Sequence, residues 1–214
     1  MDLLARAFPL LIDALGMTLF LGITSFLIGS VIGMTVALAR LFGGPVLRAI
    51  AIGYVSIWRG TPLLIQLLLV YFGLPQFGII LQPVPASIIA LSLHAGAYLA
   101  ENFRAGILSV DKGQWEAAYS LGMPFPRAFR RVAFPQAARV AIPPVGSRFI
   151  ALMKDTSLAS VVTVVELTAV AESIGSSTFR YLEMFAIVAM IYWAINSLLS
   201  LGQEVLERRL ARAY

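Results

Sequence analysis

The feature that most constrains this chain is the length of its uncharged apolar segments. Residues 14–39 carry no charged side chain, and neither do residues 184–203. About 20 apolar residues of helix cross the hydrocarbon core of a bilayer, so each segment is long enough to span it. The chain is 59% hydrophobic and 13% charged, whereas about a quarter of the residues in a soluble domain are charged. These features predict an all-α membrane protein.

A third uncharged segment, residues 60–100, must contain two spans. It holds 41 residues, too many for one helix across a bilayer. Turn residues at 73–78 and 83–85 divide it, which predicts a second span opened by Arg59-Gly60-Thr61-Pro62 and a third that continues to about Ile107. We expect Pro62 in the first turn of the second span, where its missing N–H is tolerated.

The fourth expected span is interrupted by charge. Arg139, Arg148 and Lys154 fall along it, and Pro143-Pro144 stands at its start. A lipid-facing helix would not carry these charges, so we expect a helix buried among the others, with its charges toward the interior or a wet cavity. Residues 156–182 are expected to form short helices on the outer side, with a turn at 175–178.

Basic residues indicate how the spans are oriented. They flank a Gly43-Gly44-Pro45 turn, lie in the loop after the third span and end the chain: Arg40, Arg48, Arg127, Arg130, Arg131, Arg208, Arg209 and Arg212. Cytoplasmic loops accumulate Lys and Arg, so we expect five spans with the N-terminus outside and the C-terminus inside. Residues 1–214 are expected to form one transmembrane domain that keeps its apolar N-terminal segment.

Two spacings predict contacts between or along helices. Gly29 and Gly33 form a GxxxG pattern that lets another helix approach closely, and packing within the same bundle is favoured over a dimer contact. Glu101 and Arg104 lie three residues apart on one helical face, so they can pair at membrane depth. A structural ion pair is the favoured interpretation of that second spacing.

The chain lacks the residues of an enzyme or of a metal site. It has no cysteine and one histidine, and it contains no GxxxxGK, HExxH or GxSxG pattern. We therefore expect no catalytic residue, no metal and no cofactor bound by this chain itself. The net charge of +5 is better explained by membrane orientation than by binding to nucleic acid.

The stretch Gln114-Trp-Glu-Ala-Ala-Tyr-Ser-Leu-Gly122 is the one long amphipathic segment of mixed charge. It lies between hydrophobic spans, and Gly122 with Pro124 ends a helix there. Ala117 and Ala118 allow another surface to approach, and Glu116 supplies a charge. The stretch is typical of a helix presented to a soluble partner.

Glu116-Ala117-Ala118 followed by Gly122 resembles the EAA loop of ABC importer permeases, the segment that docks on the ATPase subunit. Other stretches resemble the polar amino acid uptake subfamily: Arg59-Gly60-Thr61-Pro62, Tyr71-Phe-Gly-Leu-Pro75, Ala97-Tyr98-Leu-Ala-Glu101 and Lys154-Asp155-Thr156-Ser157. The resemblance implies a type I permease bundle in the bacterial inner membrane, with a cytoplasmic coupling loop at about 108–135.

The resemblance also implies partners. These are two copies of a P-loop ATPase that binds ATP and Mg, an extracytoplasmic substrate-binding protein, membrane lipid, and either a second copy of the chain or a sister permease. A channel or membrane scaffold whose 108–135 loop binds some other partner is the alternative from a different class. A secondary transporter is disfavoured because the chain shows no inverted repeat.

Candidate substrate contacts lie in the polar positions of the spans: Thr61, Gln66, Tyr98, Glu101, Asp155, Thr156 and Ser157. A Lys154-Asp155 pair beside two hydroxyls could meet the ammonium and carboxylate of an amino acid, and a neutralised structural pair is the alternative. For His94, a hydrogen-bonded structural role is favoured over proton relay.

Only the resemblance to known permeases narrows the range of possible substrates. Tyr71-Phe-Gly-Leu-Pro-Gln-Phe-Gly78 and Asp111-Lys-Gly-Gln-Trp-Glu-Ala-Ala118 are similar to L-cystine permeases. Arg, His, Gln or Glu are the alternative substrates. Gly146-Ser147-Arg148 stands where the family more usually has an Asn-containing stretch, and the added charge favours a more acidic or larger ligand.

Overall fold

The computed structural model describes residues 2–211, which form helices and short connections and contain no strand. The elements follow one another along the chain as α1 (Asp2–Phe42), α2 (Pro45–Gly60), α3 (Leu63–Leu68), a π-helical turn (Leu69–Gly73), a 3-10 turn (Leu74–Phe77), α4 (Pro83–Leu108), α5 (Lys112–Ser120), α6 (Phe125–Ala128), a second π-helical turn (Phe129–Ala133), α7 (Phe134–Asp155), a second 3-10 turn (Thr156–Val162), α8 (Leu167–Thr178) and α9 (Tyr181–Ala211). The predicted all-α class is confirmed for this part of the chain. Arg212 lies outside the described residues.

Within residues 2–211, three helices could cross a membrane alone by length and composition: Ala7–Phe42, Pro83–Leu108 and Tyr181–Leu210. Two further spans arise if each of two bent pairs counts as one. Pro45–Gly60 and Leu63–Phe77 meet at 108°, and Phe125–Val162 and Leu167–Thr178 meet at 50°. The expected spans therefore correspond to three long helices and two broken ones, and a total of five stays a prediction.

Helices α1 and α4 cross closely because glycines stand where they meet. A Cβ on Gly29 would lie 3.0 Å from the carbonyl oxygen of Ser92, and one on Gly33 would lie 3.0 Å from that of Gly96. No larger side chain would leave the two backbones this close. The GxxxG pattern thus packs within the bundle, as predicted from its spacing.

The second span begins earlier than predicted. Residues 45–60 are helical, and the chain breaks at Thr61 and Pro62 instead of starting a helix there. Thr61 is extended, with φ −119° and ψ 147°, because a residue before proline is pushed out of the helical region. Pro62 caps α3 from outside, so placing it within the first turn was wrong.

Two further boundaries differ from expectation. Pro143 and Pro144 lie inside α7 rather than at its start, since the helix already begins at Phe134. The carbonyl of Pro143 accepts a hydrogen bond from Gln203 at 3.0 Å, and that of Pro144 accepts one from Asn102 at 3.1 Å. Proline nitrogens cannot donate within a helix, and the amides from α9 and α4 tie this part of α7 to its two neighbours.

The expected turn at 175–178 is also absent, because α8 runs through these residues to Thr178. Gly175 lies inside the helix, where a Cβ would be 2.7 Å from the ring of Tyr181 at the start of α9. The chain turns instead at Phe179, which has a φ of +58°. The glycine therefore permits a close contact between helices and does not form the turn.

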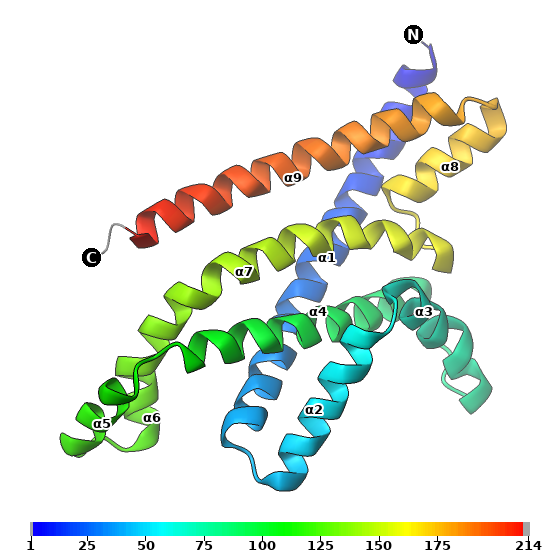
Figure 1. The fold of residues 1–214 in the computed structure, drawn as a ribbon. Coiled ribbons are helices and arrows are strands. Elements are labelled where there is room, and N and C mark those ends of the chain that lie inside the picture. Colours follow the sequence, from blue (N-terminus) through cyan, green and yellow to red (C-terminus); the bar gives the residue numbers. More distant parts are fainter. Residues whose placement is uncertain (1, 212–214) are drawn as a thin grey trace.

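The ends of the helices separate into two groups (Figure 1). The start of α1 lies beside α8 and the start of α9, whereas α5, α6 and the C-terminal end of α9 lie toward the opposite end of the bundle. Phe42, at the end of α1, contacts Phe125 of α6 with ring centroids 4.8 Å apart. The basic segments that were expected on the inner side therefore gather at one end of the molecule.

Candidate functional site

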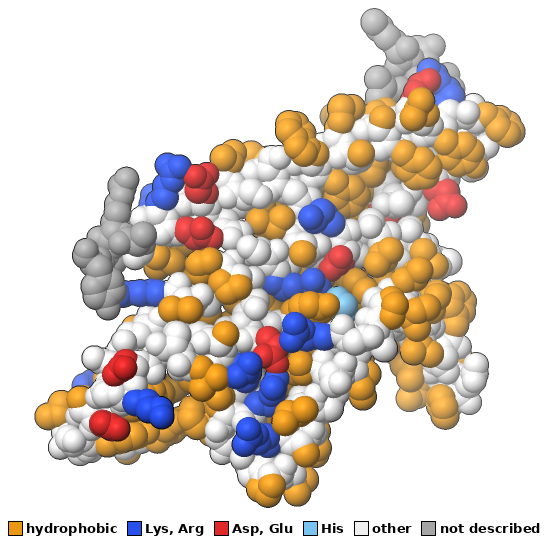
Figure 2. All heavy atoms as spheres, viewed as in Figure 1, with side chains coloured by type: hydrophobic (Ala, Val, Ile, Leu, Met, Phe, Trp, Pro, Cys, Tyr) orange, Lys and Arg blue, Asp and Glu red, His pale blue; other side chains and the backbone are white. Residues whose placement is uncertain are grey.

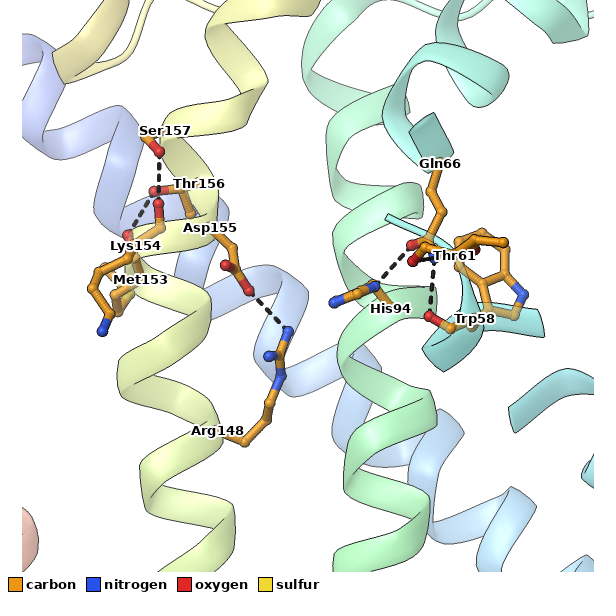
Figure 3. Close-up of polar contacts among 10 residues, drawn as sticks. All are labelled: Trp58, Thr61, Gln66, His94, Arg148, Met153, Lys154, Asp155, Thr156 and Ser157. Carbon is orange, nitrogen blue, oxygen red and sulfur yellow. Dashed lines mark hydrogen bonds and ion pairs between the residues drawn. The ribbon is translucent and has the colours of Figure 1, made fainter. Parts of the chain in front are cut away.

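The break between α2 and α3 is held by one buried amide (Figure 3). Gln66 donates through Nε2 to the carbonyl of Trp58 at 2.9 Å and lies 2.8 Å from the hydroxyl of Thr61, while its Oε1 lies 2.8 Å from Nδ1 of His94. Two of the predicted substrate contacts, Thr61 and Gln66, therefore bind one another and cap the end of α2. The sequence marks both as polar positions of the spans, but it does not show that their polar groups are satisfied within the chain.

These contacts also assign the proton on His94. Because Nε2 of Gln66 faces carbonyl oxygens, its Oε1 must face the histidine, and an amide oxygen only accepts. Nδ1 of His94 is therefore the donor. The ring packs against Tyr98 at 5.1 Å between centroids, and the structural role favoured for this histidine fits a side chain hydrogen-bonded to α3.

Glu101 joins three helices through charge. It pairs with Arg104 one turn later at 2.8 Å, with Arg40 of α1, and more distantly with Arg59 of α2 at 4.0 Å. The i,i+3 pair with Arg104 was predicted and is confirmed. The partners from α1 and α2 were missed, because nothing in local spacing indicates which distant arginines the bundle brings to a carboxylate.

Tyr98 lies against two guanidinium groups. The Cζ of Arg148 lies 4.6 Å from its ring centroid, and that of Arg59 lies 5.1 Å away. Both distances are within the range of a cation–π contact. The ring of Tyr98 thus lies between an arginine of α2 and an arginine of α7. The sequence predicts Tyr98 as a substrate contact but does not predict these two cation–π contacts.

Arg148 pairs with Asp155 at 2.9 Å, and Figure 3 shows both side chains on the side of α7 that faces His94. Lys154, expected to pair with Asp155, points away from it in the same view and makes none of the ion pairs found in the described residues. Adjacent residues of a helix point about 100° apart, whereas residues seven apart share a face. The expected Lys154-Asp155 pair is therefore replaced by Arg148 and Asp155.

The two hydroxyl groups after Asp155 donate hydrogen bonds to backbone carbonyls in the last turn of α7. Thr156 is fully buried, donates to the carbonyl of Met153 at 2.8 Å and packs near Gly22 of α1. Ser157 donates to the carbonyl of Lys154 at 2.7 Å. The structure therefore brings Tyr98 and Asp155 together through Arg148, while Thr156 belongs to the packing against α1.

Charged side chains gather on one face of the molecule, near its single histidine (Figure 2). The ion pairs on this face combine four arginines with two carboxylates: Arg40, Arg59, Arg104 and Arg148, with Glu101 and Asp155. The arginines outnumber the carboxylates, so the face has an excess of positive charge. Such an excess favours an anionic group at this place.

The predicted partner helix is α5, which Asp111 caps by accepting a hydrogen bond from the backbone of Gly113 at 2.8 Å. At its other end Gly122 has a φ of +75°, and the amide of Met123 donates to the carbonyl of Ala118 at 3.1 Å. These are the features of a Schellman C-cap. The predicted end of this helix at Gly122 is confirmed.

Residues 116–118 of α5 face in two directions. Glu116 and Ala117 are exposed, whereas Ala118 is 3% exposed and packs toward its own chain. Trp115 stacks on Phe125 at 6.0 Å between ring centroids, and Phe125 in turn contacts Phe129 at 5.9 Å. This aromatic cluster, which sequence reasoning missed, attaches α5 to the segment that leads into α7.

Among the described residues, no group of three or more His, Asp or Glu side chains could hold a metal ion. The arrangement instead offers guanidinium groups, a carboxylate and an aromatic ring on the face between α2, α4 and α7. These groups can bind a small molecule that carries charges, and α5 can bind a protein surface.

Comparison with known proteins identifies the family. The model described as "Binding-protein-dependent transport system inner membrane component" matches residues 29–212. The chain belongs to this family. It is therefore a multi-pass membrane component of a transport system, and the resemblance to ABC importer permeases drawn from its motifs is confirmed.

Curated relatives match nearly the whole chain. The L-cystine transport system permease protein TcyB of Bacillus subtilis is 46% identical over 99% of this chain and 91% of its own length. The nopaline transport system permease protein NocM of Agrobacterium fabrum is 41% identical over 93% of this chain and 87% of its own. The glutamine transport system permease protein GlnP of Escherichia coli is 37% identical over 95% and 94%. The relatives thus share a fold and differ in named substrate.

Solved structures agree on the architecture. A structure titled "Crystal structure of an amino acid ABC transporter with histidines" has a TM-score of 0.90 and 40% identity, covering 96% of each chain. The MetNI methionine ABC transporter in an inward-facing conformation has a TM-score of 0.75 at 20% identity, covering 98% of this chain and 97% of its own. The second likeness shows the permease fold alone.

Proposed function

We propose that this chain is the membrane subunit of an ATP-driven importer that carries a polar amino acid across the bacterial inner membrane. The observation that carries the proposal is the 46% identity to an L-cystine permease over 99% of the chain. The other relatives named for amino acids support the same class. The chain itself hydrolyses nothing; a partner ATPase binds ATP and Mg and supplies the energy.

In this proposal the chain crosses the membrane five times, with its N-terminus outside and its C-terminus inside, as one transmembrane domain over residues 1–214. The long helices and two broken spans support five crossings. The gathering of α5, α6 and the end of α9 at one end of the molecule supports the orientation (Figure 1), because those segments carry the basic residues that favour the cytoplasmic side.

Helix α5 is proposed to dock on a P-loop ATPase, of which the assembled importer holds two copies. Glu116 and Ala117 are exposed for this contact, while Ala118 and Gly122 shape the helix from its inner side and its end. An extracytoplasmic binding protein delivers substrate at the opposite face. A second copy of this chain, or a sister permease, completes the path.

Tyr98 and Asp155 are the predicted substrate contacts that the geometry supports best, because they border the Arg148 guanidinium on a partly exposed face. Thr61, Gln66 and Glu101 are already engaged by neighbours within the chain. We propose that these three hold the helices that form the path. Thr156 and Ser157 cap the end of α7 in the same supporting role.

L-cystine is the proposed substrate, because the relative named for it covers almost all of this chain. Glutamine is the main alternative, since GlnP covers 95% of the chain at 37% identity. Arginine, histidine and glutamate follow within the same class. A channel or membrane scaffold is the alternative outside it.

The test begins with purification of the tagged chain from native membranes in mild detergent and measurement of the intact complex mass. We expect a P-loop ATPase in a two-to-two ratio with permease subunits, and the presence or absence of a sister permease gives the dimer type. The complex, reconstituted with its binding protein, should take up labelled cystine only with ATP. Recovery of the chain alone, with uptake that ATP depletion does not change, would move the assignment to a channel or scaffold.

A further inference from the structure

The carboxylate of Asp155 in the proposed substrate path is paired with a cation of the protein itself, the guanidinium of Arg148. The two residues lie seven positions apart on α7, two helical turns, so their side chains share a face. Their charged groups are 2.9 Å apart, and both side chains are mostly buried. A carboxylate held in this way already has the positive partner that an ammonium or guanidinium group of a substrate would otherwise provide.

Arg148 is not fully engaged by this contact. A guanidinium group carries five N–H donors, and the structure shows one hydrogen bond from it, to Asp155. Its Nε is buried and has no hydrogen-bond partner in the described part of the chain. An unpaired buried donor is costly, so the geometry favours an acceptor group bound against this side of Arg148.

Apart from Asp155, the groups around Arg148 hold it in place without adding negative charge. Its guanidinium lies against the ring of Tyr98, and its side chain is only 12% exposed. On the other helices packed around this face, Arg59 also lies against Tyr98 and is itself 4.0 Å from Glu101. His94 faces the same space from α4 (Figure 3). The groups around Asp155 therefore favour an anion more than a second cation.

We propose that Arg148 determines the specificity of the permease. It binds a carboxylate of the substrate through its free donors, and by pairing with Asp155 it disfavours amino acids whose side chain has a net positive charge. The preferred class is an amino acid with a second carboxylate, such as cystine or glutamate, and arginine is rejected. This inference rests on the proposed function and narrows it.

The test measures ligand binding to the detergent-purified complex of this permease with its ATPase, without the binding protein, so that delivery does not filter the ligands. Labelled cystine and labelled arginine are titrated against the wild type and the Arg148→Gln variant. We expect the variant to shift the ratio of arginine to cystine affinity by at least about tenfold toward arginine, because Asp155 loses its internal cation. Unlabelled glutamate should compete with cystine in the wild type and lose that ability in the variant.

Control variants separate charge from folding. Arg208→Gln removes an exposed arginine of α9 that pairs with Glu204, and the ratio should not change. Arg148→Lys keeps the charge but loses the planar fork, and it should still reject arginine. If Arg148→Gln does not fold because Asp155 is left buried and unpaired, the double variant Arg148→Gln with Asp155→Asn removes both charges. It should bind neither ligand preferentially.

Three outcomes would overturn the inference. In the first, the Arg148→Gln complex, or the double variant if it alone folds, keeps the wild-type ratio of arginine to cystine affinity. In the second, this ratio changes as much in the Arg208→Gln complex as in the Arg148→Gln complex. In the third, the wild-type complex binds none of the three ligands. Each can occur while ATP-driven uptake by the full system continues, in which case the proposed function stands and only the role of Arg148 fails. Loss of ATP dependence in the wild type would instead overturn the proposed function.

Discussion

Replacement of Gly33 by alanine tests whether the close crossing of α1 and α4 holds the bundle together. A Cβ at this position would lie 2.8 Å from the Cβ of Leu99 and 3.0 Å from two backbone atoms, the nitrogen of Ala100 and the carbonyl oxygen of Gly96. Backbone atoms cannot rotate away, so the helices must separate. Overpacking of this kind costs about 1–3 kcal/mol, and alanine recovers up to about 1 kcal/mol of that through its helix propensity.

Gly16→Ala is the matched control, because Gly16 lies on the same helix and a Cβ there would have nothing within 4 Å. This variant gains the higher helix propensity of alanine without a steric clash. The difference in unfolding free energy between the two variants therefore measures the cost of the clash at Gly33. We expect that difference to be about 1–3 kcal/mol. Reversible unfolding of the purified protein, followed by far-ultraviolet circular dichroism, measures it. Equal unfolding free energies for the two variants would refute the argument.

The other predictions concern the coupling helix and the helix break. Glu116→Lys should abolish ATP-dependent uptake while the protein still inserts and folds, because it reverses a charge exposed on α5; full uptake would contradict a docking role. Gly122→Ala should weaken ATPase binding without unfolding the spans, since a left-handed residue other than glycine costs about 1–2 kcal/mol; unchanged ATPase affinity would contradict it. Gln66→Leu removes the hydrogen-bond partner of the buried His94 ring and of the part-buried carbonyl of Trp58. An unpaired buried group costs about 1–3 kcal/mol, so the unfolding free energy of this variant should fall well below that of the exposed control Gln76→Leu, and equal values would count against the cap.

Sequence reasoning worked where the information is local. The uncharged segment at 14–39 predicts a helix because the bilayer fixes the length of a span, and the structure places that segment inside α1. Gly122 and the residues before it predict a helix end because only a few residues adopt positive φ, and the Schellman hydrogen bonds are there. The i,i+3 spacing of Glu101 and Arg104 predicts an ion pair because helical geometry alone brings them together.

Reasoning from sequence failed where a distant segment decides the outcome. The sequence predicts Pro62 inside a first helical turn, but residues 45–60 are helical before it, so the same proline breaks the span instead. Their adjacency in sequence predicts a pair between Lys154 and Asp155, whereas the helix directs the two side chains apart. The sequence predicts that Arg148 faces the interior or a wet cavity but not its contact with Tyr98, which depends on how α4 and α7 pack.

The course of α7 relates the two proposed sites. Its first turn follows Phe129, which belongs to the aromatic cluster that attaches α5, and its last turns carry Arg148 and Asp155. Between these ends stand Pro143 and Pro144, whose carbonyls accept hydrogen bonds from side-chain amides of α9 and α4. A helix that lacks two of its own N–H donors bends there more readily than elsewhere. Under the proposed function, a displacement of α5 by the ATPase would therefore bend α7 at this point, between the aromatic cluster and the Arg148–Asp155 pair.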